Sequence, residues 1–379
     1  MKLAGHRRIR EDLARALVTD RLPGSLLLHG PIGIGKQRLG LWLAQRILCQ
    51  AAGSDVEPCG TCTPCRLAAR LEHPDIHWFF PVANVSGSRE KKVELFEAAR
   101  AEELEARRAF RWTRPEGMVG YYLDQVTSLR RLADKRPGMG NRKVFVVGEA
   151  ERLVSQEASQ EAANALLKLL EEPPADTTFI LTATDPELLL PTIRSRLLPI
   201  RVDPLDHDEL VALLTDQLGV DTGRADVLAR VARGAPGTAL ELAAGEDGAP
   251  FARQREQARA LLEAVAAPRP VELVAAAHAT GVGQARGEFT AVLQALQVWV
   301  RDAAALAAGA PELVVNADAI DWLRSAQARM PGAAAGAPRA LDAIARALAL
   351  AAGNVNPQLI LADLLPSLRR TLTRPAFSA

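Results

Sequence analysis

One glycine-rich segment has the residue types and spacing of a phosphate-binding loop. Gly30, Gly33, Gly35 and Lys36 lie in the run Gly-Pro-Ile-Gly-Ile-Gly-Lys. Loops of this kind surround phosphates with backbone N–H groups, and the lysine reaches the terminal phosphates. These four residues therefore predict a nucleotide phosphate site.

The residues that should hold magnesium at such a site are missing. Gln37 follows the loop lysine, where nucleotide hydrolases of this type need Ser or Thr. A later apolar strand runs into Gly148 and Glu149 instead of the expected aspartate. Because two metal ligands are lost, we expect ATP or ADP to bind weakly or non-productively, and hydrolysis to be lost while the fold is kept.

The cysteines form a second candidate site. They have the spacing C-x9-C-x2-C-x2-C and are Cys49, Cys59, Cys62 and Cys65. Four thiolates this close can form a tetrahedron around Zn²⁺, and clustering in a reducing compartment indicates metal rather than disulfides. An iron–sulfur cluster would need a further cysteine nearby, and a redox pair would use only two. A closed, structural zinc site is the favoured interpretation.

Strands and helices alternate around these residues. Apolar runs predict strands at 26–29, 143–147, 178–182 and 198–202. The first strand leads into the glycine loop, and apolar residues at spacings of four then predict a helix through 39–47. Helix-prone sequence over 157–172 ends at two prolines. Such alternation predicts a largely parallel α/β sheet.

The sequence after Pro204 has a different character, because Ala and Leu recur at helical spacing and no confident strand remains. Glycine-rich breaks separate the helical parts. The predicted domains are an α/β domain over 1–203, a small helical lid over 204–247 and a helical domain over 248–379. The first would contain the cysteine module at 49–65 and a charged insertion at 86–115.

The charged insertion has two interpretations. Its cations, with Phe110, Trp112 and Tyr121 in or near its end, could face nucleic acid. A solvated helix is the more common structure for such a run, and we favour it.

Composition limits the remaining classes. The formal net charge of +1 on 379 residues argues against a protein covered in basic charge. No apolar run approaches the ~20 residues that a membrane helix needs, and no secretory signal is recognisable. We therefore expect a cytoplasmic protein of two to three domains with no membrane segment.

Two further segments add motifs to the phosphate loop and the cysteines. Residues 162–174 read Ala-Ala-Asn-Ala-Leu-Leu-Lys-Leu-Leu-Glu-Glu-Pro-Pro, and Ser195 and Arg196 follow the next apolar strand. An arginine on a surface loop after a strand can reach a neighbouring subunit's phosphates. Together with the phosphate loop and the cysteines, in this order, these segments resemble the bacterial clamp-loader AAA+ subunits from about Gly5 to Gly237.

The resemblance implies a fold and partners. The fold would be an α/β AAA+ P-loop domain with a parallel sheet, followed by a helical lid and a C-terminal helical collar domain. The chain would belong to a hetero-oligomer with the motor (gamma/tau) and delta subunits. That complex loads the sliding clamp on primed DNA.

The departures from the family pattern select one kind of subunit. Motor subunits carry Ser/Thr, Asp-Glu and a lid arginine where this chain has Gln37, Gly148-Glu149 and Gly237. The resemblance therefore implies a stator subunit that has lost hydrolysis. It also implies that Arg196, with Ser195, is an arginine finger offered in trans, although Leu197 replaces the cysteine of that motif. Thr182 matches a sensor position.

Two alternatives remain. In the first, the chain is an active gamma/tau-like ATPase in which Glu149 is the base and Gln37 or water completes the magnesium shell. In the second, it is a stand-alone zinc DNA-binding protein, which the near-neutral charge argues against.

Overall fold

The computed structural model describes residues 3, 5–83, 89–108, 119–154, 166–243, 249–281, 286–352 and 355–374. They form two compact units. The first is Met1–Leu213 with Gly234–Thr238, and the second is Leu214–Arg233 with Ala239–Ala379. Two hydrophobic cores lie in the first unit, and a third lies in the second.

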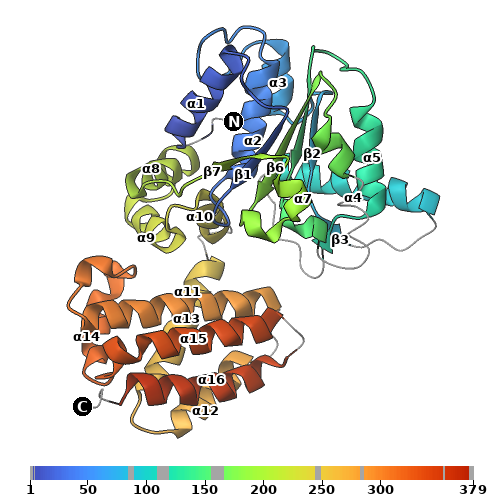
Figure 1. The fold of residues 1–379 in the computed structure, drawn as a ribbon. Helices are drawn as coiled ribbons and strands as arrows, with labels where there is room; N and C mark the ends of the chain where they lie inside the picture. Colours follow the sequence, from blue (N-terminus) through green and yellow to red (C-terminus); the bar gives the residue numbers. More distant parts are fainter. Residues whose placement is uncertain are drawn as a thin grey trace. The chain divides into compact units, whose positions relative to one another are not determined.

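The first unit is built on a parallel sheet with the strand order β2-β5-β6-β1-β7 (Figure 1). Its strands are β1 (Ser25–His29), β2 (Ile76–Phe79), β5 (Lys143–Val147), β6 (Thr177–Ala183) and β7 (Leu198–Arg201). The parallel α/β sheet is confirmed, and all strands except β2 lie where the apolar runs predict them. A small antiparallel pair, β3 (Val82–Ala83) with β4 (Val119–Gly120), lies apart from this sheet.

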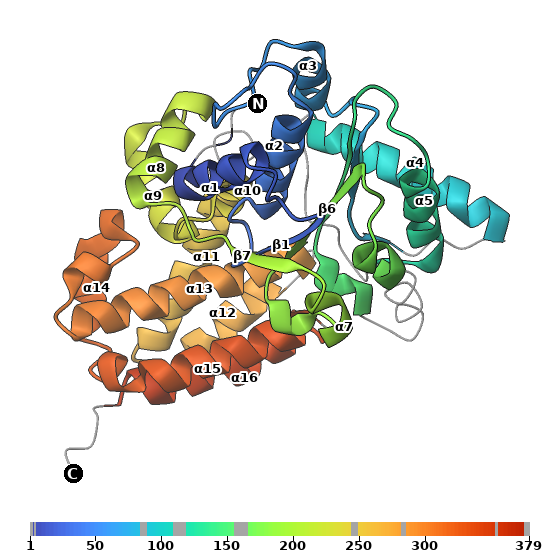
Figure 2. The ribbon, with the colours of Figure 1, turned by 45° about the horizontal axis from the view of Figure 1, so that its top comes forward.

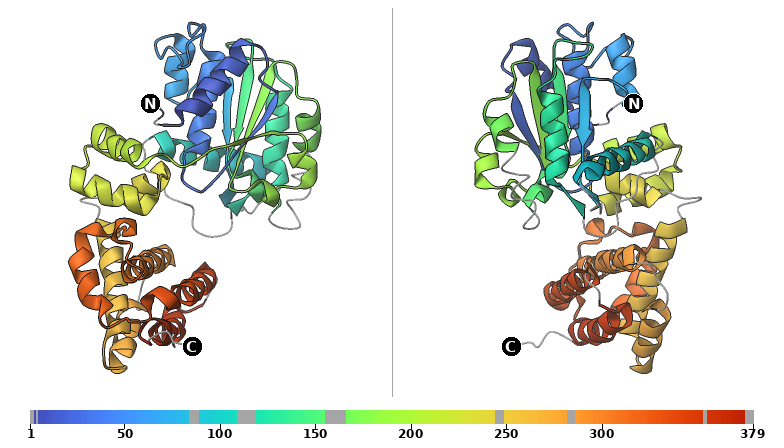
Figure 3. Two further views of the ribbon diagram at one scale, coloured as in Figure 1. Left: turned by 60° about the vertical axis from the view of Figure 1, so that its left-hand side comes forward. Right: turned by 90° about the vertical axis from the view of Figure 1, so that its right-hand side faces the viewer.

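Helices cover both faces of the sheet (Figure 3). The helices of the first unit are α1 (Arg7–Val18), α2 (Lys36–Leu48), α3 (Thr63–Ala69), α4 (Arg89–Arg108), α5 (Leu123–Ala133), α7 (Pro191–Arg194) and α8 (His207–Ala212). Because strand side chains alternate between faces, Leu26 and Leu28 of β1 join the core with α2, whereas Leu27 joins the core with α5. Residues 166–171 are helical and pack in that second core.

The charged insertion contains α4. Phe96 is buried and stacks on Tyr122 with ring centroids 5.3 Å apart, while its neighbours at 94, 95, 97 and 98 are exposed. Tyr121 is buried and donates its hydroxyl to the Gly148 carbonyl at 2.6 Å. Phe110 and Trp112 lie outside the described residues. The helix agrees with the favoured interpretation, and what the insertion does stays a prediction.

All the secondary structure described in the second unit is helical. Its helices are α9 (Thr222–Ala232), α11 (Ala249–Ala266), α12 (Val271–Gly281), α13 (Arg286–Ala307), α14 (Ile320–Gln327), α15 (Ala333–Ala352) and α16 (Pro357–Leu372), and α10 (Pro236–Ala243) belongs partly to each unit. Helices α15 and α16 lie side by side (Figure 2). A Cβ on Gly336 would lie 2.1 Å from the Thr371 carbonyl oxygen, so glycine permits this close packing. Among the described helices, none is long and apolar enough to cross a membrane. The domain boundaries at 203/204 and 247/248 stay predictions.

Asp75 fixes the turn that leads into β5. Its carboxylate accepts the backbone N–H groups of Gly138, Met139 and Gly140 at 2.5, 2.9 and 3.0 Å. Burial alone would raise the pKa of Asp75, but these three N–H groups outweigh it and hold the pKa below its ordinary value. The charged carboxylate is therefore the form that stabilises the fold.

We expect Asp75→Asn to lower the free energy of unfolding by about 2 kcal/mol at neutral pH, because it weakens hydrogen bonds to a charged acceptor. Since the folded pKa is depressed, this stabilisation is present above the unfolded pKa of about 3.9 and is lost as the pH falls through the folded value. Urea unfolding at pH 7, 4 and 3 measures it, with exposed Asp134→Asn as control. A difference between wild type and Asp75→Asn that does not shrink toward pH 3 would contradict the assignment.

Candidate functional site

The phosphate loop lies between β1 and α2, as the sequence predicts. Gly30, Gly33 and Gly35 have φ angles of 147°, 79° and 93°, which favour glycine. A Cβ on Gly30 would lie 2.3 Å from the Val202 carbonyl oxygen. The glycines are therefore required by the backbone itself, whether or not a phosphate is bound.

Lys36 is engaged by its own loop. Its Nζ donates to the carbonyl oxygens of Gly30 and Pro31, each at 2.7 Å. Burial lowers the pKa of Lys36 to about 8, although the nearby carboxylates of Glu151 and Glu149 oppose this shift. A phosphate would have to replace these two carbonyls as the partner of the ammonium.

The end of the Gln37 side chain lies directly against Gly148. The Gln37 Oε1 accepts the indole N–H of Trp78 at 2.9 Å, which holds the amide against the end of β5. A Cβ on Gly148 would lie 2.6 Å from the end of the Gln37 side chain. An aspartate at 148 would therefore collide with Gln37 in this position. The two departures from the magnesium pattern therefore lie in direct contact.

The backbone of Glu149 has an unusual conformation, and its side chain forms an ion pair. Its φ of 50° is unusual for a residue other than glycine. Its N–H donates to Thr182 Oγ1 at 3.1 Å, and its carboxylate accepts Nε of Arg152 at 2.7 Å. The carboxylate therefore already has a cationic partner.

The segment around Gly237 packs directly on the phosphate loop. The Gly237 N–H donates to the Gly33 carbonyl at 2.7 Å, and a Cβ at 237 would lie 2.9 Å from that oxygen. Any larger side chain at 237, an arginine included, would push this segment off the loop. His6 also bonds the loop, because its Nε2 donates to the Ile34 carbonyl at 2.8 Å. Burial lowers the pKa of His6, so the neutral imidazole is this donor.

The cysteine side chains converge. The four sulfur atoms lie within 4.8 Å of one another. A tetrahedral Zn²⁺ site with bonds of about 2.3 Å separates its sulfurs by about 3.8 Å, so the arrangement fits a metal ion after small adjustments. The N–H of Cys62 lowers the pKa of the Cys59 thiol to about 6 and the Thr61 hydroxyl adds to this, whereas burial raises the pKa of the Cys65 thiol. The protein environment therefore favours the metal-binding thiolate at Cys59 and opposes it at Cys65.

Residues of α2 donate hydrogen bonds to backbone carbonyls of the cysteine module. Gln45 donates to the Cys65 carbonyl at 3.0 Å. Arg46, although charged, is only 4% exposed, and it donates to the carbonyls of Asp55 and Gly53 at 3.0 and 2.8 Å. The loop between the first two cysteines is thus pinned to the helix that follows the phosphate loop.

Arg196 lies between α7 and β7, and β7 is an edge strand. Its guanidinium forms a close ion pair with Glu171, and its Nη1 donates to the Thr192 carbonyl at 2.5 Å. Ser195 donates to the same carbonyl at 3.2 Å. The loop therefore fixes the arginine beside an edge that no described strand covers.

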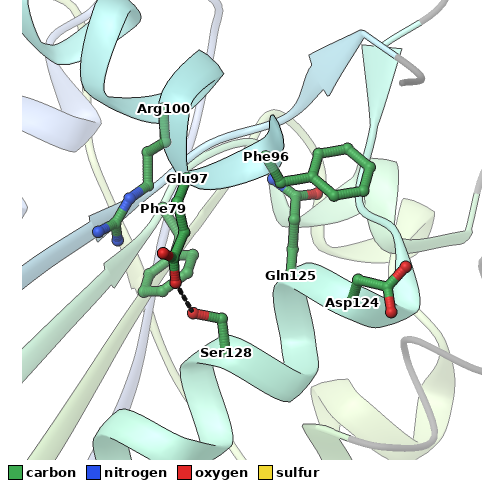
Figure 4. Close-up of a pocket in the computed structure, with 7 residues that line it drawn as sticks. All are labelled: Phe79, Phe96, Glu97, Arg100, Asp124, Gln125 and Ser128. Atoms are coloured by element: carbon green, nitrogen blue, oxygen red, sulfur yellow. Dashed lines mark hydrogen bonds between the residues drawn. The ribbon is translucent and has the colours of Figure 1, made fainter. Parts of the chain in front are cut away.

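A separate cavity lies between α4 and α5 (Figure 4). Arg100 lies over the Phe79 ring at 4.8 Å, and Ser128 donates to Glu97 at 3.3 Å. The cavity volume of about 10 Å³ holds roughly one water molecule. It is too small for a nucleotide and does not contribute to the predicted site.

Sequence reasoning missed several residues of these arrangements. Trp78, His6 and Glu171 lie far along the chain from the residues that they contact, whereas Arg152 is three positions from Glu149. Glu171 belongs to the quoted segment 162–174, but that segment gave no sign of its contact with Arg196. For Trp78, His6 and Glu171 only the tertiary structure brings the partners together, so spacing gave no signal. The described part of the helix before Glu171 begins at 166, and residues 162–165 of the quoted motif lie outside the described residues.

The chain is similar to known replication proteins. A family model described as "DNA polymerase III, delta subunit" matches residues 5–206, more than half of the chain. DNA polymerase III subunit delta' of Pseudomonas aeruginosa is 35% identical over 173 residues, which are 45% of this chain and 40% of that protein. The Escherichia coli subunit delta' is 27% identical over 237 residues, 62% of this chain and 59% of that protein.

A relative named as a gamma/tau subunit also matches. DNA polymerase III subunit gamma/tau of Mycobacterium tuberculosis H37Rv is 32% identical over 222 residues, 58% of this chain and 32% of that protein. The matches therefore span between 32% and 59% of the lengths of these three relatives.

Proposed function

Since the chain belongs to the family described as DNA polymerase III, delta subunit, we propose that it is the delta-prime subunit of a bacterial clamp loader. In this role it does not hydrolyse ATP itself. It holds its place in a hetero-oligomer with the gamma/tau and delta subunits in the cytoplasm, and it helps that complex place the sliding clamp on primed DNA. It also offers Arg196 to the ATP site of a neighbour.

The observation that carries the proposal is the fit between Gln37 and Gly148. A hydrolytic site needs a hydroxyl after the loop lysine and a carboxylate at the end of β5 to bind Mg²⁺. Here the glutamine amide occupies the space beside a glycine, and Trp78 holds it there at 2.9 Å. An aspartate at 148 would require the end of the Gln37 side chain to move away. This contact between Gln37 and Gly148 supports the joint loss of both magnesium ligands.

Two further contacts support weak nucleotide binding. Lys36 already has two carbonyl partners in its own loop, and Glu149 is paired with Arg152. Without a free ammonium or a magnesium ion, a triphosphate gains little from the loop beyond backbone N–H groups. ATP or ADP would therefore bind as a structural ligand, if at all.

Cys49, Cys59, Cys62 and Cys65 would hold Zn²⁺. With four thiolate ligands the ion has no open position, so it would supply a cross-link between the end of α2 and the start of α3 rather than chemistry.

The second candidate function is an active gamma/tau-like ATPase. The similarity to the M. tuberculosis gamma/tau subunit favours it. It requires Gln37 to leave Trp78 and Glu149 to leave Arg152 before a metal shell and a base could form.

ATP turnover separates the two functions. We expect the purified chain alone to show no magnesium-dependent turnover, and we expect turnover when gamma/tau, delta, clamp and primed DNA are added. Turnover by the chain alone that disappears in Lys36→Ala would contradict the stator role and support the second candidate.

A further inference from the structure

The guanidinium of Arg196 already has an anionic partner within its own chain. Its Nη2 donates to Oε1 of Glu171, a residue 25 positions earlier. Its Nη1 donates to the Thr192 carbonyl at 2.5 Å and is 3.5 Å from the Ser195 hydroxyl. An arginine held in this way carries a compensated charge, so it cannot stabilise a phosphate without first changing partners.

The position of Glu171 in its own helix does not stabilise its negative charge. Glu171 is the last residue of the helical stretch 166–171, and two prolines follow at 173 and 174. The C-terminal end of a helix carries a partial negative charge, which repels a carboxylate. Among the described residues, Glu172 beside it makes no side-chain hydrogen bond or ion pair. Within the part of the chain that the structure describes, the ion pair of Glu171 is the one with Arg196.

The pair can exchange partners. The side chains of Arg196 and Glu171 are 28% and 45% exposed, and ion pairs of this exposure are weak. The Nε of Arg196 is buried without an acceptor in the described part of the chain. A phosphate group carries more charge than a carboxylate and presents several oxygens to the planar guanidinium. It can therefore displace Glu171.

We propose that Glu171 is a positioning residue that acts through Arg196. It holds the guanidinium at the β7 edge when no nucleotide faces it, and it releases the guanidinium to the phosphates of ATP on a neighbouring subunit. This inference rests on the proposed function. Because the ion pair must break before Arg196 contacts phosphate, Glu171 weakens the apparent affinity of that neighbouring site for ATP.

The test uses the assembled complex with gamma/tau, delta, clamp and primed DNA. Glu171→Gln keeps the size of the side chain and removes its charge, and Glu172→Gln is the matched control. We expect Glu171→Gln to lower the KM for ATP about two- to five-fold, the range expected for loss of a partly exposed ion pair, with kcat within about two-fold of wild type. Glu172→Gln should change neither value. In the Arg196→Ala background, Glu171→Gln should have no further effect.

The outcomes separate this inference from the proposed function. An unchanged KM in Glu171→Gln, or a fall in kcat like that of Arg196→Ala, would overturn the role of Glu171 while Arg196 keeps its own. If Arg196→Ala itself leaves turnover unchanged, the arginine finger and the inference both fail. A purely structural role for Glu171 would change the melting temperature of the chain and leave the KM where it was.

Discussion

Replacing Arg196 by alanine should slow ATP hydrolysis at the neighbouring site of the assembled complex by about 10³-fold, the lower end of what an arginine supplied in trans contributes. In the proposed role the guanidinium would stabilise charge that develops on the transferred phosphoryl group, and alanine would supply nothing in its place. The loop between α7 and β7 places this residue just before an edge strand that no described strand covers. Single-turnover ATP hydrolysis with purified subunits measures the effect.

Arg194 provides a matched control for this experiment. It has the same charge two positions earlier, and it forms its own ion pair with Glu187. Arg194→Ala should stay within about two-fold of wild type, and Arg196→Lys should be intermediate because lysine keeps the charge and loses the planar fork. Wild-type turnover and clamp loading by an assembled Arg196→Ala complex would exclude a role in trans.

Replacing Cys62 by serine should remove the bound metal and destabilise the first unit. We expect zinc content to fall from one ion per chain to near zero. Loss of a structural metal that joins two helix ends should cost several kcal/mol, which corresponds to roughly 5–10 °C in Tm for a domain of about 200 residues. Metal analysis by mass spectrometry and thermal unfolding with and without a chelator measure both changes.

Thr61 supplies the control for the cysteine experiment. Its hydroxyl donates to the Cys59 sulfur at 3.6 Å and is not a ligand. Thr61→Val should therefore keep one metal ion per chain and change Tm by at most a few degrees. A wild-type chain that contains no metal and whose Tm a chelator does not change would show that the module is stable without a metal. Arg46 and Gln45, which bind the module through its carbonyls, would then hold it alone.

Much of the fold was predictable because its signals are local. The strands β1, β5, β6 and β7 are continuous apolar runs, and turn residues or helix signals bound them. The strand β2 has four residues, Ile-His-Trp-Phe, with a histidine inside it, and that run is too short and mixed to be recognised alone. It is a strand because its backbone pairs with β5 in the sheet, Ile76 opposite Val144. The helical character after residue 204 was equally clear from spacing.

The sequence by itself determined which chemical groups this protein has: a glycine loop with its lysine, four clustered cysteines, an arginine after a strand, and Gln37 and Gly148 where the magnesium pattern has a hydroxyl and an aspartate. Those properties depend on residue type and on spacings of a few positions. Only the tertiary structure decided how the groups are used. Gln37 lies against Gly148 and Trp78, and Glu171 holds Arg196, because the strand order brings together residues 25 to 111 positions apart. Contacts over such separations follow from the packing of the sheet and its helices, which local spacing does not encode.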